Sequence, residues 1–74
     1  MHIDYLIKMA NDIAAFFVTE PPEVAAESVR QHIRRFWDKR MRAQIVAHYN
    51  ETHGAQLEGP VLAAVRALAA ERSK

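Results

Sequence analysis

Residues that interrupt helices occur at only a few points along this chain. Glycine is present only at positions 54 and 59, and proline only at 21, 22 and 60. Proline has no amide hydrogen and disfavours helical backbone in the residue before it. No segment alternates apolar and polar residues for long enough to indicate a strand. The sequence therefore predicts an all-α fold in one compact domain over residues 1–74, with about four helices at 3–18, 22–37, 39–53 and 60–72.

The length and composition exclude several classes of protein. A chain of 74 residues can bury one small core, which leaves little room for a deep substrate cleft. The sequence contains no cysteine, so disulfides and cysteine-bound zinc or iron–sulfur clusters are excluded. No apolar run approaches the roughly 20 residues that a membrane span needs, and the N-terminus lacks the basic region of a signal peptide. We therefore expect a cytoplasmic protein with no membrane association.

The first predicted helix is apolar over an unusually wide arc. Its core face is formed by Ile3, Leu6, Ile7, Ala10, Ile13, Ala14 and Phe17. Tyr5, Met9 and Phe16 form a second apolar strip beside that face. Either this helix is central in the fold or another surface covers the strip, so we predict that Tyr5, Met9 and Phe16 bind a partner. A homodimer through the same strip is an alternative.

The junctions between helices carry specific local signals. Asp38 is expected to cap the third helix, and Gly54 to supply the left-handed residue at its C-terminal end. Ile33, Phe36 and Trp37 are placed on the inner face of the second helix. Because the connections are short, we expect successive helices to pack as neighbours.

Residues that could carry catalysis are sparse. The four histidines include no pair at the spacing of a helical metal site, and His48 is best explained as a core histidine with a hydrogen-bond partner. Glu23 and Glu27 are expected to pair with nearby arginines rather than act as an acid and a base. The sequence has no glycine-rich phosphate loop and no nucleophile motif. We therefore predict no catalytic, cofactor-binding or metal-binding residues.

Positive charge is concentrated in one short block. Residues 30–42 contain six bases and one acid, whereas residues 1–29 contain one base and five acids. In one interpretation Phe36 and Trp37 belong to the core and the cations are only solvated. In a second, the block binds a partner protein, with Trp37 as a partly buried anchor. A third is nucleic-acid binding, against which the balanced overall charge argues. The predicted partner-binding residues here are Arg34, Arg35, Phe36, Trp37, Arg40, Met41 and Arg42.

Two sequence blocks resemble a known family. Residues 9–17 read MANDIAAFF and residues 32–42 read HIRRFWDKRMR. These blocks, together with Gly54, Leu57, Pro60 and the apolar spacing of the last helix, resemble the delta subunit of NAD-dependent, molybdenum-containing formate dehydrogenases. One departure is Lys39, since the family usually has proline after the aspartate, which leaves the geometry of that turn open.

The resemblance implies a non-catalytic accessory subunit that binds the catalytic alpha subunit and supports assembly or stability of the active enzyme. In such complexes the other subunits hold molybdenum bis-pterin guanine dinucleotide, iron–sulfur clusters, FMN and NAD, and the delta chain holds none of them. The alternatives are a small basic module for nucleic acid, or a cofactor-insertion factor in which the arginines bind the phosphates of a guanine dinucleotide.

Overall fold

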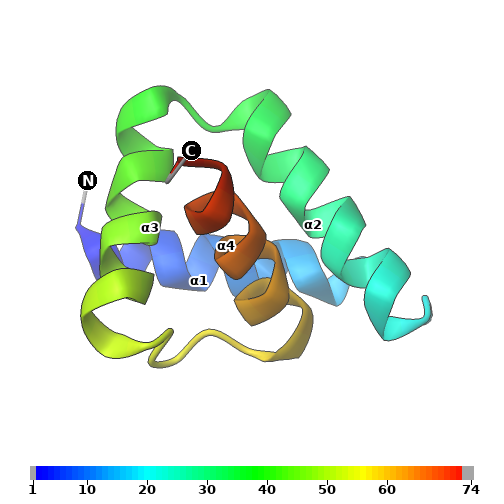
Figure 1. The fold of residues 1–74 in the computed structure, drawn as a ribbon. Helices are drawn as coiled ribbons and strands as arrows, with labels where there is room; N and C mark the ends of the chain where they lie inside the picture. The colour runs from blue at the N-terminus through cyan, green and yellow to red at the C-terminus, as the bar shows by residue number, and fades with distance from the viewer. Residues whose placement is uncertain (1, 73–74) are drawn as a thin grey trace.

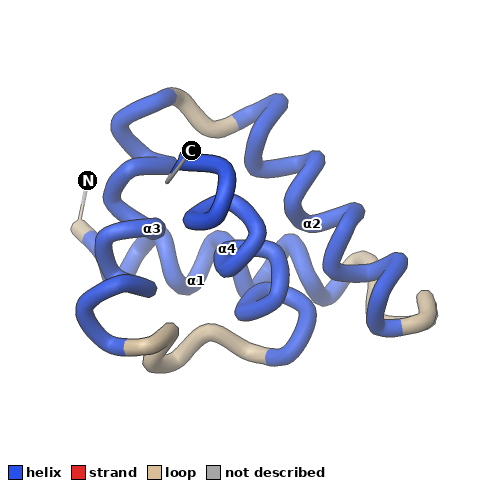
Figure 2. The backbone as a smooth tube through the Cα atoms, in the orientation of Figure 1, coloured by secondary structure: helices blue, strands red, loops and turns tan. Residues whose placement is uncertain are grey.

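The computed structural model describes residues 2–72, which form four helices and no strand (Figures 1 and 2). They are α1 (Ile3–Ala15), α2 (Pro22–Phe36), α3 (Lys39–Thr52) and α4 (Gly59–Arg72). The predicted all-α fold is confirmed. Residues 1, 73 and 74 of the predicted domain lie outside the described part of the chain. None of the described helices is both long and apolar enough to cross a membrane.

The first helix ends three residues earlier than predicted. Phe16 donates its backbone amide to Ile13 O at 3.1 Å and Phe17 donates to Ala14 O at 3.0 Å, so the chain tightens into turns after Ala15. Val18 and Thr19 are β-branched and favour a helix weakly, and the two prolines that follow cannot extend it. The predicted helix over 3–18 is therefore wrong at its C-terminal end, and Phe16 to Val18 lie on a turn.

The third helix begins at the predicted signal and ends at Thr52, one residue earlier than predicted, with His53 as its left-handed C-cap. Asp38 Oδ1 accepts a hydrogen bond from the backbone amide of Met41 at 2.8 Å, which confirms the expected cap. Lys39 takes the first helical position, so the helix starts there without the family's proline. At the other end Gly54 has φ +86°, as predicted, and His53 before it also has a left-handed backbone with φ +58°.

Helix α4 lies at the centre of the arrangement (Figure 1). It contacts the three other helices, most extensively α2, and α1 also contacts all the others. Helices α2 and α3 make little contact with each other, because the two residues between them turn a corner and α4 packs between the helices. The expectation that successive helices pack together therefore holds for α1 with α2 and for α3 with α4, and is wrong for α2 with α3.

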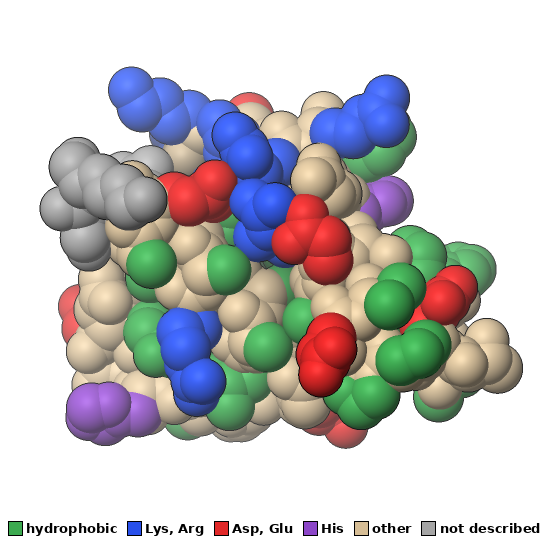
Figure 3. Space-filling view, turned by 45° about the vertical axis from the view of Figure 1, so that its right-hand side comes forward, with side chains coloured by type: hydrophobic (Ala, Val, Ile, Leu, Met, Phe, Trp, Pro, Cys, Tyr) green, Lys and Arg blue, Asp and Glu red, His purple; other side chains and the backbone are tan. Residues whose placement is uncertain are grey.

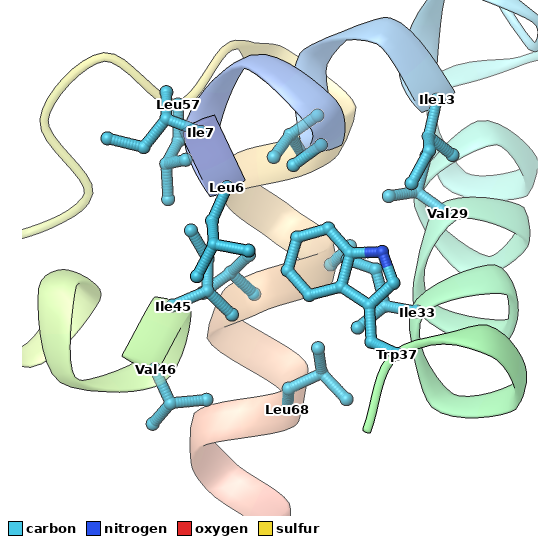
Figure 4. Packing of buried hydrophobic residues seen from close by; sticks show 14 of the residues in the cluster. Leu6, Ile7, Ile13, Val29, Ile33, Trp37, Ile45, Val46, Leu57 and Leu68 are labelled. Carbon is cyan, nitrogen blue, oxygen red and sulfur yellow. The ribbon is translucent and has the colours of Figure 1, made fainter. Parts of the chain in front are cut away.

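One apolar cluster joins the four helices. Its largest fully buried side chains are Leu6, Val29, Ile33, Ile45, Val61 and Val65. Trp37 belongs to the same cluster, and Figure 4 shows its indole beside Ile33 and pointing toward Leu6. Trp37 follows the last residue of α2 with extended backbone, at φ −89° and ψ 139°, which turns the indole into the core. The sequence placed Phe36 in the core as well, but it is 69% exposed.

Candidate protein-binding surfaces

Part of the basic block is engaged within the chain. Arg30 contacts Glu27 through two parallel bonds, from Nε to Oε1 at 2.9 Å and from Nη2 to Oε2 at 2.5 Å. Arg30 Nη1 and Arg34 Nη1 each lie 3.2 Å from Oε1 of Glu71. This network joins α2 to α4, so the expected pairing of Glu27 with a nearby arginine is confirmed. Two of the six cations therefore support the fold.

The pKa of Glu27 reports on this network. Hydrogen bonds from Arg30 and then Gln31 lower the pKa of the carboxyl from its ordinary value of 4.5 to about 2. A carboxyl whose pKa is lowered by folding stabilises the native state above its unfolded pKa, and loses that contribution as the pH falls through its folded pKa. Because the Glu27 side chain is about half exposed, water screens the interaction and its contribution is small.

We therefore expect a small loss of stability between pH 4.5 and about 2 that depends on Glu27. Urea unfolding at several pH values in this range measures it. The Glu27→Gln variant keeps the size of the side chain and should lack this part of the pH dependence. Glu23→Gln, a change of an exposed acid on the same helix, is the matched control and should follow the unmodified chain. Identical pH profiles for the Glu27→Gln variant and the unmodified chain would contradict the assignment.

Arg42 fixes the junction between α2 and α3. Its Nη1 donates to the backbone carbonyl of Arg34 at 3.2 Å, one of the carbonyls left without a helical partner at the end of α2. The Arg42 side chain is partly buried. Four of the seven residues predicted in this block therefore have roles inside the fold: Arg34 pairs with Glu71, Arg42 caps α2, Met41 packs against the core, and Trp37 belongs to the core.

Trp37 is placed differently from the sequence prediction. The side chain is 5% exposed and lies in the core, so it does not offer the partly buried anchor expected for a partner. The exposed aromatic residue of the block is its neighbour Phe36. The Phe36 ring packs on the ring of His32, with centroids 4.7 Å apart, and the Arg35 guanidinium carbon lies 6.0 Å from the Phe36 ring centre.

The remaining cations of the block face solvent, and Arg35 among them lies against Phe36. Arg35, Lys39 and Arg40 are exposed, and among residues 2–72 no ion pair engages any of them. We call the set His32, Arg35, Phe36, Lys39 and Arg40 the basic–aromatic surface. Figure 3 shows Lys and Arg side chains along the upper edge of the molecule, with a histidine below the cations at the upper right.

The apolar strip predicted on the first helix is not continuous. Tyr5 is 60% exposed and Phe16 is 84% exposed, but Met9 between them is half-buried and packs against the core. Phe16 also lies beyond the end of α1, on the turn. Tyr5 and Phe16 therefore belong to separate places on the surface rather than to one helical face.

An apolar groove that sequence reasoning missed is lined by Phe17 and Val18 of the turn after α1. It has a volume of about 630 Å³ and is enclosed by the end of α1, the turn after it, and the first residues of α2 and α4. Apolar lining residues include Ala14, Ala15, Phe17, Val18, Pro22, Ala25, Pro60 and Ala63. The available signal was the run FFV, which ends three positions before the first of two prolines and places large apolar side chains where a helix cannot continue.

The histidines do not form a metal site. Among the described residues no group of three His, Asp or Glu side chains is placed to hold a metal ion. His48 Nε2 lies 2.6 Å from the carbonyl oxygen of Ala55 and donates to it, so the predicted hydrogen-bond partner is present. The His48 side chain is half-buried rather than in the core, and its hydrogen bond holds the loop after α3 against that helix.

The fold and these surfaces define a small helical protein whose exposed features suit contact with other macromolecules. The family model described as NADH-dependent formate dehydrogenase delta subunit FdsD matches residues 5–65. The chain belongs to this family. Comparisons with curated proteins and with solved structures find no match.

Proposed function

We propose that this chain is a non-catalytic accessory subunit that binds the molybdenum-containing catalytic subunit of formate dehydrogenase and stabilises the active complex. The family match indicates a subunit of such a complex. The observation that carries the docking role is the basic–aromatic surface, in which Arg35, Phe36 and Arg40 are exposed although the neighbouring Trp37 is buried.

This surface has the chemistry of a protein contact. Arginine forms bidentate hydrogen bonds with carboxylates, and an aromatic ring supplies apolar area at a low cost in side-chain entropy. Phe36 is held by His32 and flanked by Arg35, so the ring needs little ordering when a partner binds. We expect the catalytic subunit to offer an apolar socket for Phe36 surrounded by acidic residues.

The position of the surface also explains how binding would stabilise the complex. The basic–aromatic surface lies on both sides of Trp37 in the sequence, and Trp37 belongs to the core. The same junction is held by Asp38, which caps α3, and by Arg42, which binds the last turn of α2. A partner that binds only the folded chain favours folding by mass action. Binding of phosphates in a nucleic acid or a guanine dinucleotide is less well supported, because Arg30, Arg34 and Arg42 of the block are engaged internally.

We expect the double variant Arg35→Glu with Arg40→Glu to lose co-purification with the catalytic subunit. The change reverses two exposed charges of the surface, and we expect affinity to fall roughly a hundredfold, as for the loss of two principal contact residues. Co-expression of the subunits with a tag on the catalytic subunit, followed by quantitative size-exclusion chromatography, measures the effect. Circular dichroism checks that helicity is retained.

The control reverses the same number of positive charges elsewhere on the molecule. Lys8 and Arg66 are exposed cations outside the surface, held only by a bond to Asp12 and by a 3.3 Å contact with the Tyr49 hydroxyl. The variant Lys8→Glu with Arg66→Glu should co-purify as the unmodified chain does. Full retention of the first variant, or equal loss of both, would refute docking through this surface.

A further inference from the structure

The apolar groove and the basic–aromatic surface are connected along α2. A second hollow of about 320 Å³ is lined by Phe17 and by residues of α2, which are Glu27, Ser28, Gln31, His32, Arg35 and Phe36. Phe17 lines both hollows, so they adjoin at this side chain. Figure 3 shows hydrophobic side chains at the right of the molecule, below the histidine and the cations of the upper right. We call the apolar groove and this second hollow together the track. The track follows α2, which at 1.5 Å per residue is about 21 Å long.

The groove end of this track has three polar lining residues, Asn11, Glu20 and Glu58, and the two glutamates are exposed rather than buried among the apolar walls. Small-molecule sites combine apolar walls with a few convergent polar groups. The only amide side chain in the lining is Asn11, and both ends of its amide are engaged: Nδ2 donates to Gln56 O at 3.1 Å, and Oδ1 accepts from the Glu58 amide at 3.3 Å. Asn11 therefore braces the loop before α4 against α1, which keeps the groove formed. A preformed apolar groove of this kind suits a polypeptide.

The charges at the two ends of the track have opposite sign. The charged residues that line the groove are Glu20 and Glu58, and no lysine or arginine is among them. At the far end Arg35 and Glu27 line the hollow. The Glu27 carboxylate is paired with Arg30, so the charge that is left without an ion pair among the described residues there is that of Arg35, with Lys39 and Arg40 nearby in sequence. An occupant that matches both ends must carry positive charge at one end and negative charge at the other.

We propose that this track binds one amphipathic helix of a partner subunit, with its apolar side in the groove and against Phe17 and Phe36. Lysine or arginine lies at its groove end, and aspartate or glutamate at its Arg35 end. A helix satisfies its own backbone hydrogen bonds, whereas an extended segment would find no strand edge on the helices described here. A length of 21 Å corresponds to about 14 helical residues, with apolar anchors at i, i+3 or i+4, and i+7. This inference rests on the proposed function, because the helix belongs to a subunit of the same complex.

Photo-cross-linking in the assembled complex tests the proposal. Val18 lines the groove and is 78% exposed, and Phe36 is 69% exposed, so p-benzoylphenylalanine at either position should leave the fold intact. After co-expression, irradiation and digestion, mass spectrometry identifies the linked peptides. We expect both probes to reach the same stretch of one partner subunit, about 14 residues or fewer apart. The Val18 probe should lie near lysine or arginine, and the Phe36 probe near aspartate or glutamate.

A matched pair of variants tests occupancy of the groove. Ala63 and Ala70 are exposed alanines two turns apart on α4, and of the two only Ala63 is among the groove residues. Arginine preserves helix propensity at both positions. Ala63→Arg adds bulk and like charge where the basic end of the helix would lie, so we expect about a tenfold or greater loss of affinity in the complex and loss of the Val18 cross-link. Ala70→Arg should leave both unchanged.

Several outcomes would overturn the proposal. They are cross-links from the two positions to different subunits, cross-links to a second copy of this chain, reversed charges along the linked stretch, or unchanged affinity for Ala63→Arg. The proposed function fails separately, if the unmodified chain does not co-purify with the catalytic subunit. A chain that co-purifies but gives none of the expected cross-links leaves the proposed function standing and removes the helix-binding track.

Discussion

The Trp37→Ala variant should lose about 3–5 kcal/mol of unfolding free energy, the range for removing a large buried aromatic side chain. Trp37 is 5% exposed and lies in the cluster that joins all four helices. A domain of this length has a total stability of roughly 4–11 kcal/mol, so the loss is a large fraction of it. We expect the melting temperature to fall by at least about 12 °C, measured by circular dichroism at 222 nm.

The adjacent residue provides the control. Phe36 is also aromatic and lies one position earlier, but it is 69% exposed. Phe36→Ala should change the unfolding free energy by less than about 1 kcal/mol, since exposed side chains contribute little to stability. The same variant should weaken binding to the catalytic subunit, because the ring belongs to the basic–aromatic surface. Equal losses of stability in the two variants would contradict the assignment of Trp37 to the core and Phe36 to the surface.

The Gly54→Ala variant should lose about 1–3 kcal/mol, the usual cost of a strained backbone position. Gly54 has φ +86°, a conformation that a residue with a Cβ adopts only with strain. An added methyl group would also lie 2.2 Å from Leu62 Cδ1, so the Leu62 side chain must move. The loop between α3 and α4 would then fit less well against the core. Urea unfolding measures the effect as a lower midpoint at unchanged m value.

Gly59→Ala is the matched control for this change. Gly59 is the first residue of α4, and no neighbouring heavy atom lies within 4 Å of where its methyl group would be. Alanine reduces the freedom of the unfolded chain, so we expect stability to rise by about 0.4–1 kcal/mol. A similar loss in both variants would show that neither the left-handed backbone nor Leu62 distinguishes Gly54.

The sequence predicted the helices well because glycine and proline mark their ends. The cap at Asp38 and the left-handed residue at Gly54 depend on local interactions within a few residues, so they could be predicted from neighbouring positions. The end of α1 was misplaced because the apolar spacing continues through Phe17 although the backbone does not. The spacing of apolar residues shows which side chains face the core. The end of the helix depends instead on the prolines that follow and on the β-branched Val18.

The surfaces were harder to predict because they depend on contacts between distant parts of the chain. The basic block was recognised, but its division into engaged and exposed cations depends on Glu71, which is far away in sequence. The choice between Phe36 and Trp37 for the core depends on the extended backbone at the helix end. The groove forms only where α1, α2 and α4 pack together, and no pattern within a single helix predicts how the three helices pack.

The central position of α4 has a consequence for how the protein is made. Of the four helices, α4 is the last to be synthesised, yet it supplies Val61, Ala64, Val65, Leu68 and Ala69 to the buried cluster. While the ribosome is still translating α3, α1 can pack against α2, but the side chains of α4 that complete the cluster are missing. We therefore expect a nascent chain that stops before residue 59 to stay open and sensitive to protease, and compaction to occur only after translation has passed α4.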